Sequence, residues 1–247
     1  MSNFLVTGSS RGLGLELVRQ LAAHSEFREG TVFATARKYS TELEEVITSI
    51  KCSVILVPLD LADEQMIVLS AEKVKAVLAG QSLDILINPA VHVTGMHNVP
   101  TVTFTDTDKC IQEIDQHVGH FSILSIVEFA WPPGAKVSYS SSIFGSMTQA
   151  REVGYAPCPA KDALNALMVQ YALSYEDEGL VFMAARPGWL KSDMGGQDAD
   201  LTLSQGAEAV LDMAMTAGSR ENGSFKNISV PGWEKHDGHD VPWRVSR

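Results

Sequence analysis

A chain of 247 residues with 30 acidic and 19 basic side chains carries a formal net charge of −11. That charge argues against binding to nucleic acid or an anionic membrane, which both need clustered positive charge, and it favours a small-molecule substrate. Three cysteines, Cys52, Cys110 and Cys158, lack the spacing of metal ligands, so we expect free thiols in a reducing compartment and no bound metal.

Short apolar runs alternate with amphipathic segments along the whole chain, a pattern typical of parallel strands joined by helices. We expect strands at residues 4–6, 31–36, 54–59, 83–87, 136–139, 180–185 and 225–230. We expect helices at residues 13–23, 41–50, 64–78, 106–130, 160–175 and 204–217. The pattern predicts an α/β fold in which residues 1–247 form a single domain: a Rossmann-type doubly wound parallel sheet of about seven strands with helices on both faces.

Three longer irregular stretches, at residues 91–104, 145–159 and 190–203, each follow a predicted strand. Parallel sheets bind ligands beyond the carboxyl ends of their strands, so we expect these loops to wall one substrate pocket. The N-terminus has no basic and apolar leader, and no run is long enough to span a bilayer. We therefore expect a cytoplasmic protein.

The turn between the first predicted strand and the first helix is rich in glycine and reads Thr7-Gly8-Ser9-Ser10-Arg11-Gly12-Leu13-Gly14. Such a turn lets the backbone approach a pyrophosphate, while the N-terminus of the helix supplies N–H donors and positive potential. The sequence therefore predicts a dinucleotide site at Gly8, Ser10, Arg11, Gly12, Leu13 and Gly14.

The second predicted strand leads into Arg37. A fold selective for NAD usually has an acid here for the ribose 2′-hydroxyl, whereas a guanidinium can bind a 2′-phosphate, so Arg37 favours NADP(H). Arg11 could add its charge or could be a solvated surface arginine. Asp60 and Leu61 end the third strand, where Asp60 could accept a hydrogen bond from an adenine amino group or could cap the next helix.

Six ordered motifs resemble the short-chain dehydrogenase/reductase superfamily across nearly the whole chain. They are Thr7-Gly8-x-x-x-Gly12-x-Gly14, Asp60-Leu61, Leu83-Asp84-Ile85-Leu86-Ile87-Asn88, Ser141-Ser142-Ile143-Phe144-Gly145, Lys161-x-x-x-Asn165 and Pro187-Gly188-Trp189-Leu190-Lys191-Ser192-Asp193-Met194. Residues 140–196, with the ending Asp237-Gly238-x-x-x-Pro242-Trp243, most resemble the small carbonyl-reductase-like branch that includes insect sniffer-type and bacterial C-factor-type proteins. The resemblance implies a homo-oligomer, a dimer or tetramer, and further NADP(H) contacts from Asn88, Ala90, Lys161, Pro187, Gly188, Leu190 and Ser192.

The catalytic pattern of that family is only partly present. A family serine polarises the substrate carbonyl, and a lysine follows the acidic tyrosine by four residues; Ser142 and Lys161 match these two roles. Position 157, where the tyrosine is expected, is a proline, which has no ionisable group. Tyr155 and His92 are the candidate replacement acids, each weighed against being a packed or surface residue with no catalytic role.

Two more side chains could contact the substrate. Asp162 could balance the charge of a cationic substrate, although it projects about 100° around the predicted helix from Lys161. Trp189 could form a lid over the substrate or could be a structural aromatic.

Retained cofactor residues beside a missing acid leave three hypotheses. The leading one is an NADP(H)-dependent enzyme of atypical site that reduces an imine, an iminium ion or an activated carbonyl in specialised metabolism, with or without coupled cyclisation. An iminium ion already carries the charge that an acid would otherwise create, so orientation becomes the main requirement. The alternatives are a redox-silent cyclase or Diels–Alderase and a non-enzymatic NADP(H)-binding or interaction protein. A carbonyl reductase that uses Tyr155 as its acid comes close behind.

Overall fold

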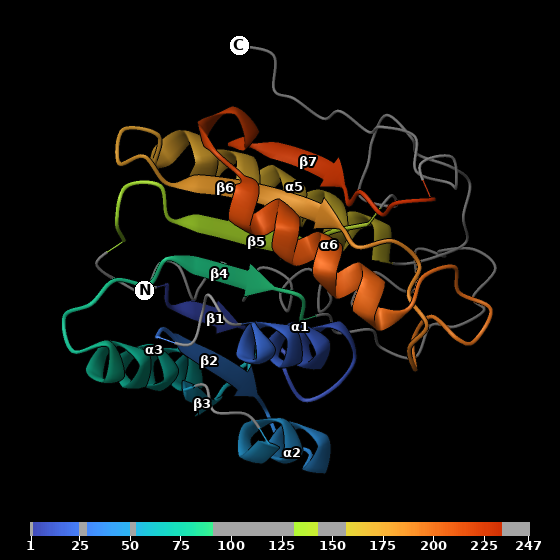
Figure 1. The fold of residues 1–247 in the computed structure, drawn as a ribbon. Coiled ribbons are helices and arrows are strands. Elements are labelled where there is room, and N and C mark those ends of the chain that lie inside the picture. The colour runs from blue at the N-terminus through green and yellow to red at the C-terminus, as the bar shows by residue number, and fades with distance from the viewer. Residues whose placement is uncertain (1, 25–28, 50–52, 91–130, 143–156, 234–247) are drawn as a thin grey trace, which may run out of the picture.

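The computed structural model describes residues 2–24, 29–49, 53–90, 131–142 and 157–233. Within them lies one sheet of seven strands, all parallel, in the order β3-β2-β1-β4-β5-β6-β7 (Figure 1). The strands are β1 (Phe4–Val6), β2 (Thr31–Ala36), β3 (Ser53–Pro58), β4 (Ile85–Asn88), β5 (Lys136–Ser140), β6 (Val181–Arg186) and β7 (Ser224–Asn227). The helices are α1 (Gly12–Ala23), α2 (Thr41–Ser49), α3 (Glu64–Leu78), α5 (Pro157–Ser174) and α6 (Leu203–Thr216), with a 3₁₀ turn at Ser219–Glu221.

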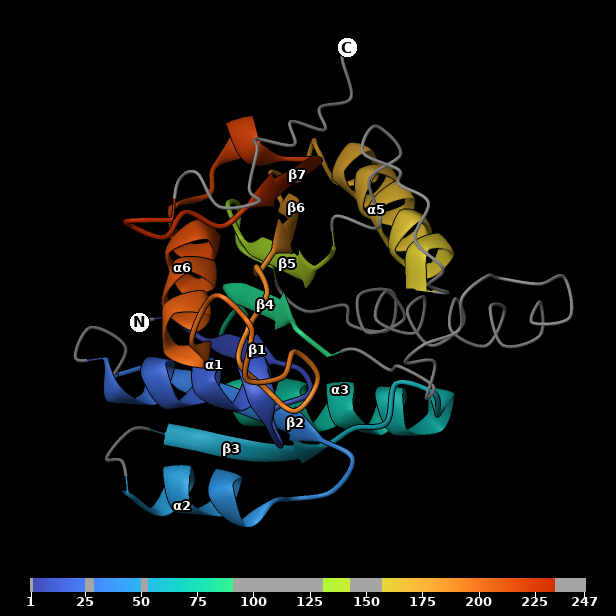
Figure 2. The same cartoon turned by 90° about the vertical axis from the view of Figure 1, so that its right-hand side faces the viewer.

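Helices cover both faces of the sheet, and two apolar cores lie between the layers (Figure 2). Along β1, Phe4 and Val6 pack against α1 and α6, whereas Leu5 packs on the opposite face with side chains of α3 and α5. Strand side chains alternate between faces, so a strand covered on both sides is apolar at every position. This burial is the physical reason for the continuous apolar runs, and it confirms the predicted doubly wound α/β fold.

Several predicted boundaries were wrong by a few residues. The seventh strand ends at Asn227 rather than at residue 230. The helix expected from residue 160 begins at Pro157, so the loop expected to run to residue 159 ends earlier. Prolines fit the first turn of a helix because the N–H groups there have no partner within the helix. The predicted helix at 106–130 and loop at 91–104 lie outside the described residues.

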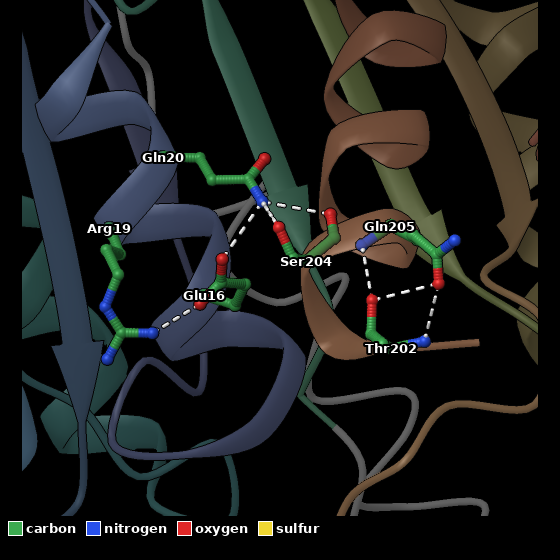
Figure 3. A network of polar contacts seen from close by, with 6 residues as sticks. All are labelled: Glu16, Arg19, Gln20, Thr202, Ser204 and Gln205. Atoms are coloured by element: carbon green, nitrogen blue, oxygen red, sulfur yellow. Dashed lines mark hydrogen bonds and ion pairs between the residues drawn. The ribbon is translucent and has the colours of Figure 1, made fainter.

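A side-chain network fixes α6 against α1 (Figure 3). The Gln20 amide of α1 donates to the Ser204 carbonyl over 3.0 Å and is also bonded to Glu16. Thr202 begins α6 with a capping box, in which its hydroxyl accepts from the Gln205 N–H while the Gln205 side chain accepts from the Thr202 N–H. The start of α6 is thereby held beside the helix that follows the glycine-rich turn.

None of the helices within the described ranges is both long and apolar enough to cross a membrane.

Candidate nucleotide and active site

The carboxyl ends of β1 and β4 are the point at which the connections diverge. From β1 the chain continues outward to β2 and β3 on one side, then returns to β4 and continues to β7 on the other. Connections leaving in opposite directions open a crevice at such a switch point, where doubly wound sheets bind ligands. Figure 2 shows the turn after β1 and the long segment after β6 at this edge.

The turn after β1 requires glycine at the positions that the sequence singled out. Gly8 and Gly12 have φ angles of +61° and +58°, in the left-handed region. A Cβ atom on Gly14 would lie 2.3 Å from the Gly8 carbonyl oxygen, and one on Gly8 would lie 2.9 Å from the Ala90 Cβ. The absence of side chains therefore lets α1 begin immediately beside the switch point.

Among the described residues, no side chain caps the N-terminus of α1. The N-cap residue, Arg11, makes no side-chain capping bond, and the first turn of α1 contains no acid. Unpaired N–H groups and the positive end of the helix dipole are the donor set that a pyrophosphate requires. The residues present thus fit the dinucleotide that the sequence predicts.

Hydrogen bonds hold the glycine-rich turn in place. The Ser9 N–H donates to the Thr35 carbonyl over 2.8 Å, and the Ser40 hydroxyl donates to the Ser10 carbonyl over 2.6 Å. Arg11 extends into solvent, where its Nη1 lies 3.7 Å from Oδ2 of Asp193, in the segment after β6. Leu13 is partly buried against the core beneath α1.

The two predicted adenosine-side residues, Arg37 and Asp60, follow β2 and β3. Arg37 is exposed directly after β2 and has no ion-pair partner among the described residues. Asp60 does not cap α3: its Oδ1 accepts from the Ala62 N–H over 3.1 Å, whereas Asp63 is the N-cap and accepts from Met66. The capping alternative for Asp60 was therefore wrong, and Leu61 beside it packs partly against the core.

Lys161 lies in the first part of α5 and is 5% exposed. Its Nζ donates to the Ser140 carbonyl at the end of β5 over 2.7 Å. Burial lowers the pKa of Lys161 to about 7, because a low-dielectric surrounding disfavours the charged form. Ser142 is half-buried two residues beyond the carbonyl that Lys161 contacts. The structure therefore brings the two matching catalytic residues to the same edge of the sheet.

The remaining candidate residues are Asp162, Tyr155 and His92, and the structure describes only the first of them. Asp162 is partly buried, and desolvation raises its pKa. Its Oδ1 has no hydrogen-bond partner within the described part of the chain. Tyr155 and His92 lie outside the described residues.

The segment after β6 is a compact loop. Gly188 has a φ of +79°, and Trp189 is half-exposed with its Nε1 donating to the Gly195 carbonyl over 2.8 Å. The Ser192 hydroxyl accepts from the Gly195 N–H over 3.1 Å. Leu190 is buried, and a Cβ on Gly206 of α6 would lie 2.4 Å from its Cδ2, so its side chain belongs to the core.

Sequence reasoning missed one contact at this edge. Asp193 was not predicted to contact Arg11, and no periodic pattern links residues so far apart in the chain. The buried side chain of Asn88 was assigned to the cofactor, but it is only 1% exposed.

Comparison with known proteins reveals one consistent relationship. A model of the short chain dehydrogenase family matches residues 2–201. The short-chain dehydrogenase/reductase atnB of Arthrinium sp is 30% identical over 209 residues, which are 78% of this chain and 76% of that protein. Norsolorinic acid ketoreductase nor1 of Dothistroma septosporum is 26% identical over 261 residues, 98% of this chain and 92% of that one.

Solved structures share the fold. The carbonyl reductase Sniffer of D. melanogaster superimposes with a TM-score of 0.79 at 23% identity, covering 92% of this chain and 96% of that one. An NADPH-bound carbonyl reductase from chicken fatty liver gives a TM-score of 0.78 at 23% identity, covering 93% and 94%.

Proposed function

The chain belongs to the short-chain dehydrogenase family, and from that premise we propose that it is an NADP(H)-dependent oxidoreductase that reduces a polarised C=O or C=N bond. The observation that carries this proposal is the structure of the glycine-rich turn and the start of α1. Gly8 and Gly14 leave no room for a Cβ atom, and Arg11 makes no side-chain cap for the helix. That arrangement suits a bound pyrophosphate. The substrate is a small molecule of specialised metabolism, as the name of the norsolorinic acid ketoreductase suggests for that relative.

Residues at the carboxyl edge would hold NADP(H) along its length. The glycine-rich turn and α1 would bind the pyrophosphate, Arg37 the 2′-phosphate, and Asp60 the adenine. Lys161 would bind the nicotinamide ribose, and the backbone from Pro187 to Ser192 the carboxamide. The bound cofactor would supply a hydride. Two structural neighbours hold this type of cofactor: the carbonyl reductase from chicken fatty liver has NADPH bound, and a protein from Burkholderia multivorans has NADP bound.

The chain's own side chains would polarise the bond and hold a proton. The Ser142 hydroxyl would donate to the substrate oxygen or nitrogen, and Lys161 would place a positive charge nearby. With its pKa lowered to about 7, Lys161 is protonated in part of the population at neutral pH and can release that proton. Asp162 would attract a cationic iminium substrate, which needs no acid. Tyr155 and His92 are further proposed acids.

Isotope transfer tests the proposal directly. NADPH deuterated at the nicotinamide C4 position is incubated with the protein and a panel of ketones and imines, and the products are analysed by mass spectrometry. Deuterium in a product supports the reductase. Tight NADPH binding with no labelled product from any substrate overturns it and favours the redox-silent cyclase.

Single substitutions then assign the acid. Tyr155→Phe removes only the phenolic hydroxyl, so unchanged turnover would eliminate Tyr155 as the proton donor. His92→Asn serves as the matched variant for the imidazole. If both variants retain full turnover on a ketone, the proton must come from Lys161 or from solvent.

A further inference from the structure

Two consecutive residues of the glycine-rich turn are tied to β2 and to the segment that follows it. The Ser9 N–H donates to the Thr35 carbonyl of β2 over 2.8 Å, and the Ser40 hydroxyl donates to the Ser10 carbonyl over 2.6 Å. Ser9 and Thr35 are buried, and Ser40 is half-buried. The turn that would bind the pyrophosphate is therefore attached to the part of the chain that carries Arg37.

Ser40 is itself fixed by α2. Its hydroxyl oxygen accepts from the Leu43 N–H over 3.2 Å, and its carbonyl accepts from the Glu44 N–H over 3.1 Å. Leu43 and Val46 anchor α2 in the core that it shares with α1, where both side chains are buried. A serine hydroxyl can donate one hydrogen bond and accept others at the same time, so Ser40 joins the start of α2 to the glycine-rich turn through one oxygen atom.

The segment between β2 and Ser40 carries Arg37, the proposed ligand of the 2′-phosphate. Ala36 ends β2, and its carbonyl accepts from the Leu59 N–H over 3.1 Å. The side chains of residues 37–39 follow and are exposed. This exposed segment is thus held at both ends, by the sheet at Ala36 and by α2 at Ser40.

One NADP(H) molecule would occupy both sites. Its pyrophosphate and 2′-phosphate are joined covalently through the adenosine ribose, so binding of the second group becomes an intramolecular event once the first is bound. The gain in affinity is largest when the separation of the two protein sites matches the ligand and is held fixed. The bond from Ser40 to Ser10 is a direct tie between these two sites.

The same bond sets the orientation of the peptide group between Ser10 and Arg11. The C=O and N–H groups of a trans peptide lie in one plane and point in opposite directions. A Ser10 carbonyl that is held by Ser40 therefore also fixes the direction of the Arg11 N–H, at the start of α1. It also keeps the carbonyl oxygen bonded to a donor, so that this oxygen does not turn toward an incoming phosphate.

We propose that Ser40 is a positioning residue for NADP(H) and that, together with Arg37, it sets the preference for NADP(H) over NAD(H). By holding the Ser10 carbonyl, Ser40 keeps the pyrophosphate turn at a fixed separation from the Arg37 guanidinium. The inference rests on the proposed function, because it requires that the turn and Arg37 bind one cofactor. It adds a residue that acts on the cofactor through the backbone of Ser10.

Binding of two nucleotides to Ser40 variants tests the proposal. Ser40→Ala should weaken NADPH binding by about tenfold and NADH binding by no more than about threefold, because one hydrogen bond is lost and only NADPH has two anionic groups whose separation matters. Ser40→Thr keeps the hydroxyl and should leave both Kd values near those of the wild type. Fluorescence titration measures the Kd values. An equal loss for both nucleotides, or no loss for either, overturns the proposal.

A double-mutant cycle with Arg37→Ala separates positioning from an independent effect. Without the guanidinium, NADPH is held by its pyrophosphate alone, as NADH is. Adding Ser40→Ala to Arg37→Ala should therefore weaken NADPH binding by no more than about threefold. Independent sites would show the same loss from Ser40→Ala in both backgrounds, and that result would overturn the proposal.

Thr202→Ala is the matched control for helix capping, since the Thr202 hydroxyl caps α6 by accepting from the Gln205 N–H over 3.2 Å. Ser40→Ala and Thr202→Ala should both lower the Tm, because each removes a hydroxyl from the start of a helix. Only Ser40→Ala should change the ratio of the Kd values for NADPH and NADH. An equal change of this ratio in Thr202→Ala would assign the effect to lost capping and overturn the proposal.

The role of Ser40 and the proposed function fail in different ways. If the wild-type protein binds neither nucleotide, both are overturned. If it binds NADPH but transfers no deuterium to any substrate, the reductase fails, and the double-mutant cycle still decides the role of Ser40. If deuterium is transferred but the ratio of Kd values stays unchanged in Ser40→Ala, only the role of Ser40 fails.

Discussion

Arg11 and Asp193 form an ion pair, with Nη1 and Oδ2 3.7 Å apart, that joins the glycine-rich turn to the loop after β6. The two side chains are 75% and 86% exposed, so the pair contributes little to folding stability. Its effect is expected on ligand binding instead, because a carboxylate beside Arg11 competes with a phosphate for the same guanidinium.

Asp193→Asn should therefore tighten NADPH binding by about two- to threefold at low ionic strength, with a smaller gain at high salt. Fluorescence titration of NADPH measures the Kd. Asp198→Asn is the matched control, since Asp198 is an exposed acid of the same loop. An equal effect of both variants would indicate only the lower overall negative charge.

Arg37→Ala should weaken NADPH binding by about ten- to a hundredfold and change NADH binding little, because only NADPH has a 2′-phosphate for the guanidinium to bind. Parallel titrations with the two nucleotides measure the ratio of Kd values. Lys38→Ala provides the control at the next exposed residue. A similar loss of affinity for both nucleotides would contradict the assigned role.

Gly14→Ala should abolish NADPH binding and lower the Tm, because the new Cβ would lie 2.3 Å from the Gly8 carbonyl oxygen and force the turn to shift. Gly12→Ala is the comparison: its φ of +58° is strained for alanine, at a cost of about 1 kcal/mol, but apart from the adjacent backbone and neighbouring residues no atom lies within 4 Å of the new Cβ. Gly12→Ala should bind NADPH more tightly than Gly14→Ala does. The reverse order would be inconsistent with this packing.

Lys161→Met should stabilise the fold below pH 7, where the wild-type protein must bury an ammonium. Between about pH 7 and 10.5, the native state has released this proton while the unfolded chain still binds it. Wild-type stability therefore rises with pH across this window relative to the variant. The full shift corresponds to about 5 kcal/mol.

Urea denaturation at pH 6, 8 and 9.5 measures this difference, with Lys75→Met as an exposed control. The same variant should bind NADPH more weakly, because it lacks the proposed ribose contact. A stability difference that does not change with pH would show that Lys161 keeps its ordinary titration.

Much of the fold could be predicted because burial on both faces leaves a continuous apolar run in each strand. The helix at Glu64–Leu78 was predicted with its observed bounds. The start of α5 was misplaced because the loop was expected to run to Pro159, although a first helical turn accepts proline and the helix begins at Pro157.

Less of the candidate site than of the fold could be predicted from the sequence. Glycine spacing located the turn after β1, since only glycine tolerates such close backbone contact. The Arg11–Asp193 pair depends on which strand ends become neighbours, and local periodicity carries no such information.

The three-residue β1 has a consequence for how the chain acquires its structure during synthesis. Phe4 pairs with Val32 on one side and with Ile85 on the other. On the ribosome, β1, β2 and β3 can assemble first, while the second edge of β1 stays open until β4 has emerged. A nascent chain that stalls before Ile85 would expose an apolar strand edge, the kind of surface that chaperones bind and that aggregates when left unprotected.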